Sequence, residues 1–277
     1  MPFAPSRGRS PVRIHYALHG DRGPVVVLLH GLGLSSRFWF DVPALLAGDP
    51  AAPRRVLTVD NRGTGRSDKP LRPWSMRAMA DDVVDVLDHA GVEEAVVVGL
   101  SMGGMIAQHV AIRHPARVRG LVLLATTAGF LTGALPEARA LARLLTLPLG
   151  GPRAGVNLVR LLLPESRWAE GRELFREWPR AMREDPTTPA TFAAHFLAAS
   201  THFAAPRLGR IRCPAVVVAG RHDPLVPLRN AEVLARRIPQ AELEILEDAG
   251  HAVFAGDPDL VRRMVDRLER STAPRAW

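Results

Sequence analysis

Residues 96–111 read VVVGLSMGGMIAQHVA, an apolar run that breaks around Ser101 and then continues with the character of a helix. The serine stands between Gly99 and Gly103, two positions away on either side. A turn this tight strains the serine backbone, and glycines at these positions have no Cβ to clash with the chain that passes them. A strand, Gly-x-Ser-x-Gly and then a helix is the pattern of an exposed, nucleophilic serine.

A simpler interpretation is that Ser101 only caps the helix that begins at Met102, as serine often does. Capping does not require a glycine two residues away on both sides. We therefore expect the Ser101 hydroxyl to stand above the carboxyl end of a sheet, where open α/β sheets bind their ligands. The start of the following helix favours a negative charge that develops there.

Short apolar runs alternate with helical patterns along most of the chain. Because these runs are continuously apolar, we expect strands buried on both faces and a mostly parallel central sheet flanked by helices, an α/β fold. The expected strands are Val12–Ala17, Val25–His30, Arg54–Val59, Ala95–Leu100, Val118–Ala125, Ala215–Ala219 and Leu243–Leu246. The expected helices between them are Ser75–Ala90, Met102–His114, Arg229–Arg237 and Pro258–Arg270.

One long stretch breaks this alternation. Between residues 130 and 210 there is no convincing strand, and prolines separate helical segments rich in Leu, Ala and Arg. We expect residues 1–129 and 211–277 to form one α/β core, and residues 130–210 to form an inserted helical cap. Its expected helices are Glu137–Leu145, Ala154–Leu163, Trp168–Arg183 and Pro189–Phe203, with Pro179 placed to kink or split the third.

Composition narrows the class of protein. Hydrophobic residues make up 47% of the 277 residues, enough to bury a full core. The formal net charge is +8, but the arginines are scattered and often stand beside Asp or Glu, so we expect no nucleic-acid or membrane partner. Cys213 is the only cysteine, and the first residues lack the apolar core of a signal peptide, so we expect a cytoplasmic protein.

A serine hydroxyl needs a base, normally histidine, and the base needs an orienting carboxylate. The candidate base is His251, which follows the last expected strand beside Gly250, a residue that allows a sharp turn. The candidate carboxylate is Asp223, in the loop after the preceding strand, and the chain order Ser, Asp, His is the one expected for this architecture. Asp248 is a rival, but its closeness to His251 in sequence favours a role in the turn.

Acyl transfer also needs N–H groups that bind the oxyanion. The first candidate is the N–H of Met102, directly after the serine. The second is the N–H of Leu32 in the stretch His30-Gly31-Leu32-Gly33, because the two glycines let the backbone turn its N–H groups inward. The alternative is that Gly31 and Gly33 form only a simple turn.

Together these motifs resemble the α/β-hydrolase fold family over essentially the whole chain. The motifs are HGLG at 30–33, DNRGTGRSD at 60–68, GLSMGG at 99–104, GRHDPLVP at 220–227 and GH at 250–251. The resemblance implies that 60–68 is a structural loop, so Asp60, Arg62 and Ser67 are given no chemical role. GLSMGGMIAQ is similar to carboxylesterases and enol-lactonases, whereas epoxide hydrolases and haloalkane dehalogenases of the family use Asp where this chain has Ser101.

We therefore expect a serine hydrolase that cleaves a carboxylic ester or lactone of a small, largely apolar substrate through an acyl-enzyme on Ser101. Two alternatives stay open. One is hydrolysis of a carbon–carbon bond in a diketone-type substrate by the same three residue types, and the other is a non-catalytic small-molecule receptor on the same fold. No metal and no organic cofactor is expected, and the sequence leaves the oligomeric state open.

Overall fold

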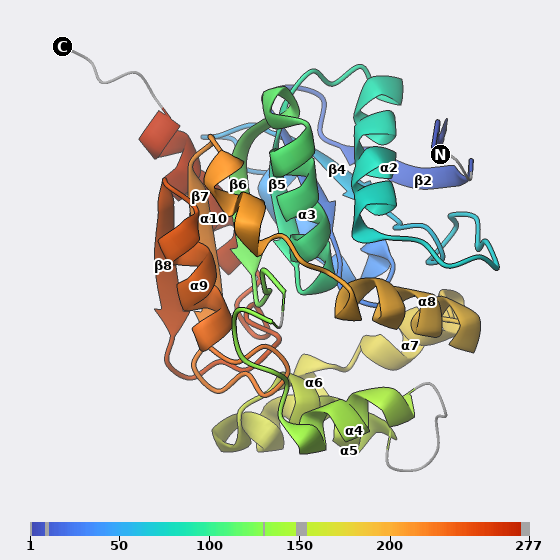
Figure 1. The fold of residues 1–277 in the computed structure, drawn as a ribbon, viewed down its shortest axis with the longest axis vertical. Helices are drawn as coiled ribbons and strands as arrows, with labels where there is room; N and C mark the ends of the chain where they lie inside the picture. The colour runs from blue at the N-terminus through green and yellow to red at the C-terminus, as the bar shows by residue number, and fades with distance from the viewer. Residues whose placement is uncertain (1, 9–10, 130, 148–153, 273–277) are drawn as a thin grey trace.

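The computed structural model describes residues 2–8, 11–129, 131–147 and 154–272. In this part of the chain eight strands form one sheet in the order β1-β2-β4-β3-β5-β6-β7-β8 (Figure 1). The six strands β4-β3-β5-β6-β7-β8 run parallel to one another, and β2 is antiparallel to both of its neighbours, β1 and β4, which confirms the mostly parallel sheet. The bounds are β1 Phe3–Pro5, β2 Arg13–His19, β3 Val25–Leu29, β4 Arg55–Val59, β5 Ala95–Leu100, β6 Val118–Leu124, β7 Ala215–Gly220 and β8 Ala241–Leu246.

Helices cover both faces of the sheet, which explains why its central strands are apolar throughout. In β3, for example, Val27 and Leu29 join the core under α2, α3 and α9, while Val26 and Leu28 join the core under α1 and α10. These helices are α1 Val42–Ala47, α2 Met76–His89, α3 Met102–Arg113, α9 Arg229–Arg237 and α10 Leu260–Thr272. Over the described ranges, no helix is both long and apolar enough to cross a membrane.

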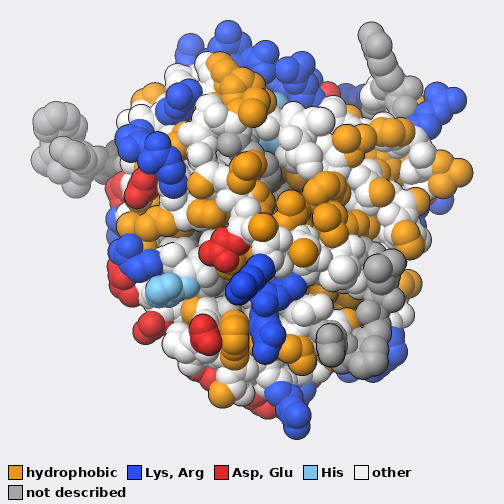
Figure 2. Space-filling model, turned by 60° about the horizontal axis from the view of Figure 1, so that its bottom comes forward, with side chains coloured by type: hydrophobic (Ala, Val, Ile, Leu, Met, Phe, Trp, Pro, Cys, Tyr) orange, Lys and Arg blue, Asp and Glu red, His pale blue; other side chains and the backbone are white. Residues whose placement is uncertain are grey.

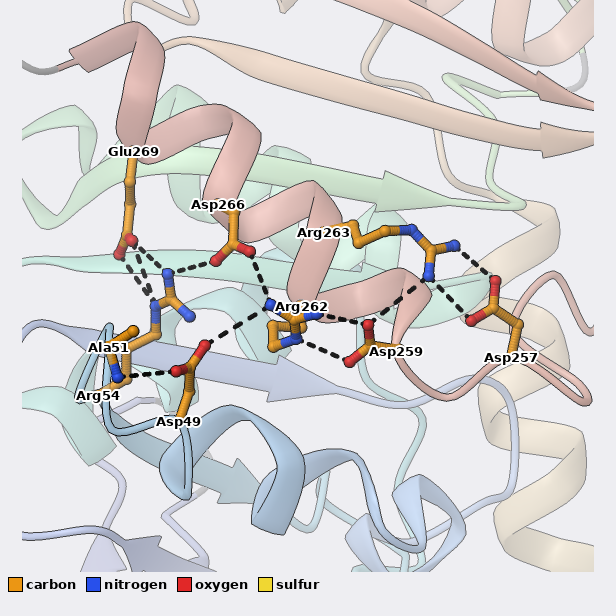
Figure 3. A network of polar contacts seen from close by, with 9 residues as sticks. All are labelled: Asp49, Ala51, Arg54, Asp257, Asp259, Arg262, Arg263, Asp266 and Glu269. Atoms are coloured by element: carbon orange, nitrogen blue, oxygen red, sulfur yellow. Dashed lines mark hydrogen bonds and ion pairs between the residues drawn. The ribbon is translucent and has the colours of Figure 1, made fainter.

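Ion pairs fasten α10 to the edge of the core near the start of β4 (Figure 3). The side chain of Arg54 is only 2% exposed, and its guanidinium donates to Asp266 at 2.6 Å and to Glu269 at 2.5 Å. Arg262 pairs with Asp266 and reaches Asp49 at 3.6 Å. Each arginine of this network lies within ion-pair distance of at least one carboxylate, so its charge is neutralised within the fold.

Between β6 and β7 the chain forms what we call the helical segment, residues 131–147 and 154–210, and its described part contains no strand. It lies beyond the carboxyl ends of the central strands (Figure 1). Residues 130 and 148–153 of the expected cap lie outside the described residues. The helices are α4 Ala138–Thr146, α5 Ala154–Leu162, α6 Gly171–Leu174, α7 Trp178–Glu184 and α8 Pro189–Ser200.

The helix expected over Trp168–Arg183 is not continuous. A 3-10 helix over Glu165–Glu170 leads into α6, and α7 begins separately, with Pro179 in its first turn. Proline is tolerated there because the first N–H groups of a helix have no partner within the helix, whereas inside a longer helix it would remove a hydrogen bond. The proline therefore splits the expected helix.

The loop at 60–68 makes structural contacts. Arg62 donates two hydrogen bonds of 2.6 Å to Asp82, and both side chains are buried. Burial raises the pKa of Asp82. The Asp60 carboxylate accepts from the N–H of Ser36 at 2.8 Å, and the Ser67 hydroxyl donates to the Asp60 carbonyl at 2.6 Å. This loop is thereby tied to α2 and to the loop that follows β3.

Candidate active site

Ser101 lies between the end of β5 and the start of α3. Its backbone has φ 53° and ψ −118°, a strained conformation for a residue with a side chain. The Ser101 side chain makes no capping hydrogen bond to α3, so the capping interpretation does not describe it. Its N–H donates to the Leu124 carbonyl at 2.8 Å, and its carbonyl accepts from the Thr126 hydroxyl at 2.7 Å. The serine turn is thus held by β6 and the loop after it.

The glycines around the serine are required by close backbone contacts. A Cβ added at Gly99 would lie 2.4 Å from the Gly103 carbonyl oxygen, and one added at Gly103 would lie 2.0 Å from the Leu29 carbonyl oxygen. Both distances are far shorter than a carbon atom allows. The first turn of α3 therefore presses directly on the ends of β3 and β5, and this leaves the serine as the residue that projects.

The loop after β3 lies against this turn, because β3 and β5 are neighbours in the sheet. A Cβ at Gly31 would lie 3.3 Å from the Ser101 Cβ and 3.8 Å from its hydroxyl oxygen. Gly33 has φ 74°, a left-handed conformation that favours glycine. The loop therefore turns its backbone around the serine, as the two glycines predict.

The N–H groups of this loop differ in whether they have partners. The N–H of Gly31 donates to His30 Nδ1 at 2.8 Å, and the N–H of Gly33 donates to His195 Nδ1 at 3.0 Å. The Leu32 N–H between them donates to no described residue. Within the same ranges the N–H of Met102, in the first turn of α3, is also without an acceptor. Two N–H groups next to Ser101 or next to Gly31, which is close to Ser101, thus have no described acceptor: one in the loop after β3 and one in the first turn of α3.

Asp223 and His251 meet by a direct hydrogen bond. They follow β7 and β8, neighbouring parallel strands, so both lie at the same edge of the sheet as Ser101. His251 Nδ1–H donates to Asp223 Oδ2 at 2.7 Å, and the two residues are only 7% and 4% exposed. Asp223 Oδ1 accepts from the N–H groups of Leu225 at 2.8 Å and Val226 at 2.9 Å. Asp248, the rival carboxylate, lies exposed at the surface.

The loop that carries His251 is also held by the helical segment. The N–H of Ala252 donates to the Leu162 carbonyl, at the end of α5, at 3.0 Å. Arg167 Nη1 donates to the Ala255 carbonyl at 3.2 Å. A Cβ at Gly250 would lie 2.7 Å from the Leu162 carbonyl oxygen, so only glycine fits beside α5. These contacts join segments far apart in sequence, and no local pattern predicts them.

His30, in the loop after β3, is kept neutral by burial. Burial lowers the pKa of His30 to about 3, and His251 contributes further to this lowering. His30 is therefore neutral, and its Nδ1 is free to accept the hydrogen bond from Gly31.

Cys213 gives no competing nucleophile, since burial raises the pKa of its thiol to about 11. In the described ranges, no three His, Cys, Asp or Glu side chains are gathered as metal ligands would be.

Comparison with known proteins agrees with this architecture. The family model described as alpha/beta hydrolase fold matches residues 24–258. A relative, the provisionally named carbamate hydrolase RutD of Azorhizobium caulinodans, is 32% identical over 280 residues, which cover 96% of this chain and 97% of the relative. A thermophilic esterase structure from Thermogutta terrifontis has TM-score 0.80 and 25% identity, covering 98% of both chains. The enol-lactonase structure from Burkholderia xenovorans LB400 has TM-score 0.79 and 25% identity, covering 97% of this chain and 100% of that chain. The chain therefore belongs to the α/β-hydrolase fold family.

Proposed function

We propose that this protein hydrolyses a carboxylic ester or lactone of a small, largely apolar molecule through an acyl-enzyme on Ser101. The observation that carries the proposal is the 2.7 Å hydrogen bond between His251 and Asp223 at the sheet edge where Ser101 projects. This bond occupies Nδ1 of the imidazole, so Nε2 remains as the nitrogen that accepts a proton from the serine. The unpaired N–H groups of Leu32 and Met102 supply the second requirement, donors for an oxyanion.

In the first half of the cycle, the Ser101 oxygen attacks the carbonyl carbon while His251 takes the serine proton. Asp223 stabilises the imidazolium that forms, and the N–H groups of Leu32 and Met102 bind the oxyanion. One such donor contributes roughly 3–4 kcal/mol to lowering the barrier. The carbon–oxygen bond to the leaving group then breaks, and the alcohol departs with the proton from His251.

In the second half, a water molecule replaces the alcohol. His251 takes a proton from this water, and the hydroxide oxygen attacks the acyl carbon. The bond between that carbon and the Ser101 oxygen breaks, the proton returns to the serine, and the carboxylic acid is released. A lactone follows the same steps, except that the alcohol stays attached to the acid.

The helical segment supports an apolar substrate. Seen from the end of the molecule that carries the helical segment, apolar side chains are spread across the surface (Figure 2). Exposed large apolar residues of the segment include Leu131, Leu135, Leu145 and Val156.

The names of relatives also bear on the bond that is cleaved. The esterase and enol-lactonase structures support an ester or lactone, and the relative named as a carbamate hydrolase makes a carbamate the second candidate.

The proposal is tested by assaying Ser101→Ala on an aryl ester, a small lactone and a carbamate side by side. We expect the variant to lose about 10⁴-fold or more of the turnover on the preferred substrate, with an unchanged fold by circular dichroism. A serine-reactive phosphonate should label the parent protein on Ser101, as read by mass spectrometry of its peptides. The matched control is Ser75→Ala, which removes the cap of α2, should cost about 1 kcal/mol of stability and should keep full turnover. Near-normal turnover in Ser101→Ala would overturn the proposal.

A further inference from the structure

His195 is a completely buried histidine of the helical segment that reaches the loop after β3. It lies on α8 with 0% exposure. Its Nδ1 accepts from the Gly33 N–H at 3.0 Å, and its Nε2–H donates to the Arg62 carbonyl at 2.9 Å. An N–H can only donate and a carbonyl can only accept, so the two partners fix a single neutral tautomer. Burial lowers the pKa of His195 to about 4, which agrees with a neutral ring.

Neighbouring residues of the same segment reinforce this contact. The Thr187 hydroxyl donates to the Gly33 carbonyl, so both polar groups of Gly33 are bound by the helical segment. The Thr191 hydroxyl donates to the Gly63 carbonyl at 3.0 Å, one residue after the carbonyl that His195 binds. The Trp74 indole lies edge-on to the His195 ring, with centroids 5.5 Å apart. Residues 187–195, the end of the loop before α8 and the first half of the helix, are thereby joined to the two loops that follow β3 and β4.

The bonded groups surround the Leu32 N–H, one of the two donors that the proposed chemistry requires. Residues 31–34 form a turn in which the Leu34 N–H donates to the Gly31 carbonyl at 3.3 Å. Gly33, the third residue, has φ 74°, as in a type II turn. Turns of types I and II differ by a flip of their middle peptide unit, here the one between Leu32 and Gly33. The N–H of that peptide unit is the group that His195 accepts.

We propose that His195 is a positioning residue for the oxyanion site: by accepting the Gly33 N–H it fixes the turn that presents the Leu32 N–H to the substrate carbonyl. The inference rests on the proposed function. His195 uses both ring nitrogens on backbone groups and has no hydrogen bond to Ser101 or His251. Oxyanion donors act only when they lie about 2.7–3.1 Å from the developing charge, so a small rotation of this turn reduces transition-state binding more than substrate binding.

The test compares His195→Leu, which removes both hydrogen bonds, with His195→Gln, whose amide supplies one acceptor and one donor. For the preferred substrate, we expect His195→Leu to lower kcat about 10- to 100-fold while KM stays within about threefold. His195→Gln should recover most of the lost kcat. The matched control is His202→Leu, since His202 is also buried but binds the Thr127 carbonyl, away from the turn. It should lower the melting temperature and leave kcat within about twofold.

A spectroscopic readout tests the geometry separately from turnover. In the ¹⁵N-labelled parent protein, the N–H···N bond should give a through-hydrogen-bond coupling between the Gly33 nitrogen and His195 Nδ1, and its absence would overturn the inference. Should His195→Leu not fold, Thr187→Val decides the question, because it removes only the bond to the Gly33 carbonyl. We expect it to lower kcat about threefold or more at an unchanged KM, and an unchanged kcat would overturn the positioning role of the contacts at Gly33.

The two proposals fail in different ways. Retained turnover in Ser101→Ala overturns the proposed function and, with it, the oxyanion role of His195. If Ser101→Ala is inactive but His195→Leu keeps its kcat, only the positioning role is overturned. A loss of kcat in His202→Leu equal to that in His195→Leu would show a general effect of destabilisation and would also overturn the positioning role.

Discussion

The serine turn and the loop after β3 lie in contact, yet different parts of the molecule hold them. The backbone of Ser101 is bound by Leu124 and Thr126, both from the sheet and its adjoining loop. Gly33, by contrast, is bound through its N–H and its carbonyl by His195 and Thr187 of the helical segment. The position of the nucleophile therefore depends on the core, whereas the position of the proposed oxyanion donor depends on the inserted helices.

The histidine loop combines both kinds of support. Its imidazole is bound by Asp223 of the core, while its backbone is bound by the Leu162 carbonyl at the end of α5. The loops after β3 and β8 are thus both held in part by the helical segment. A change in the segment can disturb the chemistry without touching Ser101.

The largest expected effect separates the two supports of the histidine loop. Asp223→Asn leaves the bond from Ala252 to Leu162 intact but removes the carboxylate that selects the imidazole tautomer. We expect kcat to fall about 10⁴-fold with little change in the melting temperature. The matched variant Asp248→Asn, at an exposed site, should keep kcat within about twofold. If Asp248→Asn is the damaging change, the carboxylate has been assigned wrongly.

A second prediction compares how much space the two regions leave for a side chain. Gly103→Ala puts a carbon 2.0 Å from the Leu29 carbonyl oxygen, so the core must shift; we expect a loss of at least about 3 kcal/mol in the free energy of unfolding. Gly155, on α5 of the helical segment, has nothing within 4 Å, and Gly155→Ala should gain up to about 1 kcal/mol. Urea unfolding measures both. Equal stability of the two variants would contradict the close approach at the serine turn.

The smallest effect per residue is the loss of stability when the pH is lowered. Burial lowers the pKa of four histidines to about 3 or 4, below the ordinary value of 6.5 that they regain on unfolding; these are His30, His109, His195 and His202. The unfolded chain therefore binds protons first as the pH falls, and stability is lost from about pH 6.5 down to about pH 4. Each histidine should lower the free energy of unfolding by about 1 kcal/mol between pH 7.5 and pH 5.5.

Urea unfolding at these two pH values checks the acid prediction. His195→Gln removes one of the four groups, so its loss of stability on acidification should be smaller than that of the parent protein. Equal free energies of unfolding at pH 7.5 and pH 5.5 would contradict the buried, neutral state of these rings. The serine turn, residues 99–104, contains no titratable side chain, so acid should affect the histidine-lined contacts first.

Local signals predicted the sheet and the serine turn because the physical causes are local. The apolar run before Gly99, the flanking glycines and the following helix all lie within 16 residues. Asp223 and His251 could be selected because parallel strands bring the residues after them to one edge of the sheet. In the described structure they form a hydrogen bond, and their catalytic roles stay predictions.

The remaining features depend on contacts between distant parts of the chain. His195 lies 162 residues from Gly33, and on α8 its sequence context is that of any helical residue. β1 spans only Phe3–Pro5 and contains a proline, so it has too few residues for a strand pattern and is defined by its pairing with β2. The break between α6 and α7 was foreseen only as an alternative, at Pro179.

The hydrogen bond between His195 of α8 and the turn at Gly33 has a consequence for protein engineering. Exchanging the inserted helices between relatives is an obvious way to try to change the substrate range of such hydrolases. In this protein a chimera joined at the ends of the insertion would replace the acceptor of the Gly33 N–H while keeping its donor. Recipient and graft should therefore be matched at positions 33, 62 and 195 together, because His195 of the insertion binds the backbone of both Gly33 and Arg62 in the core.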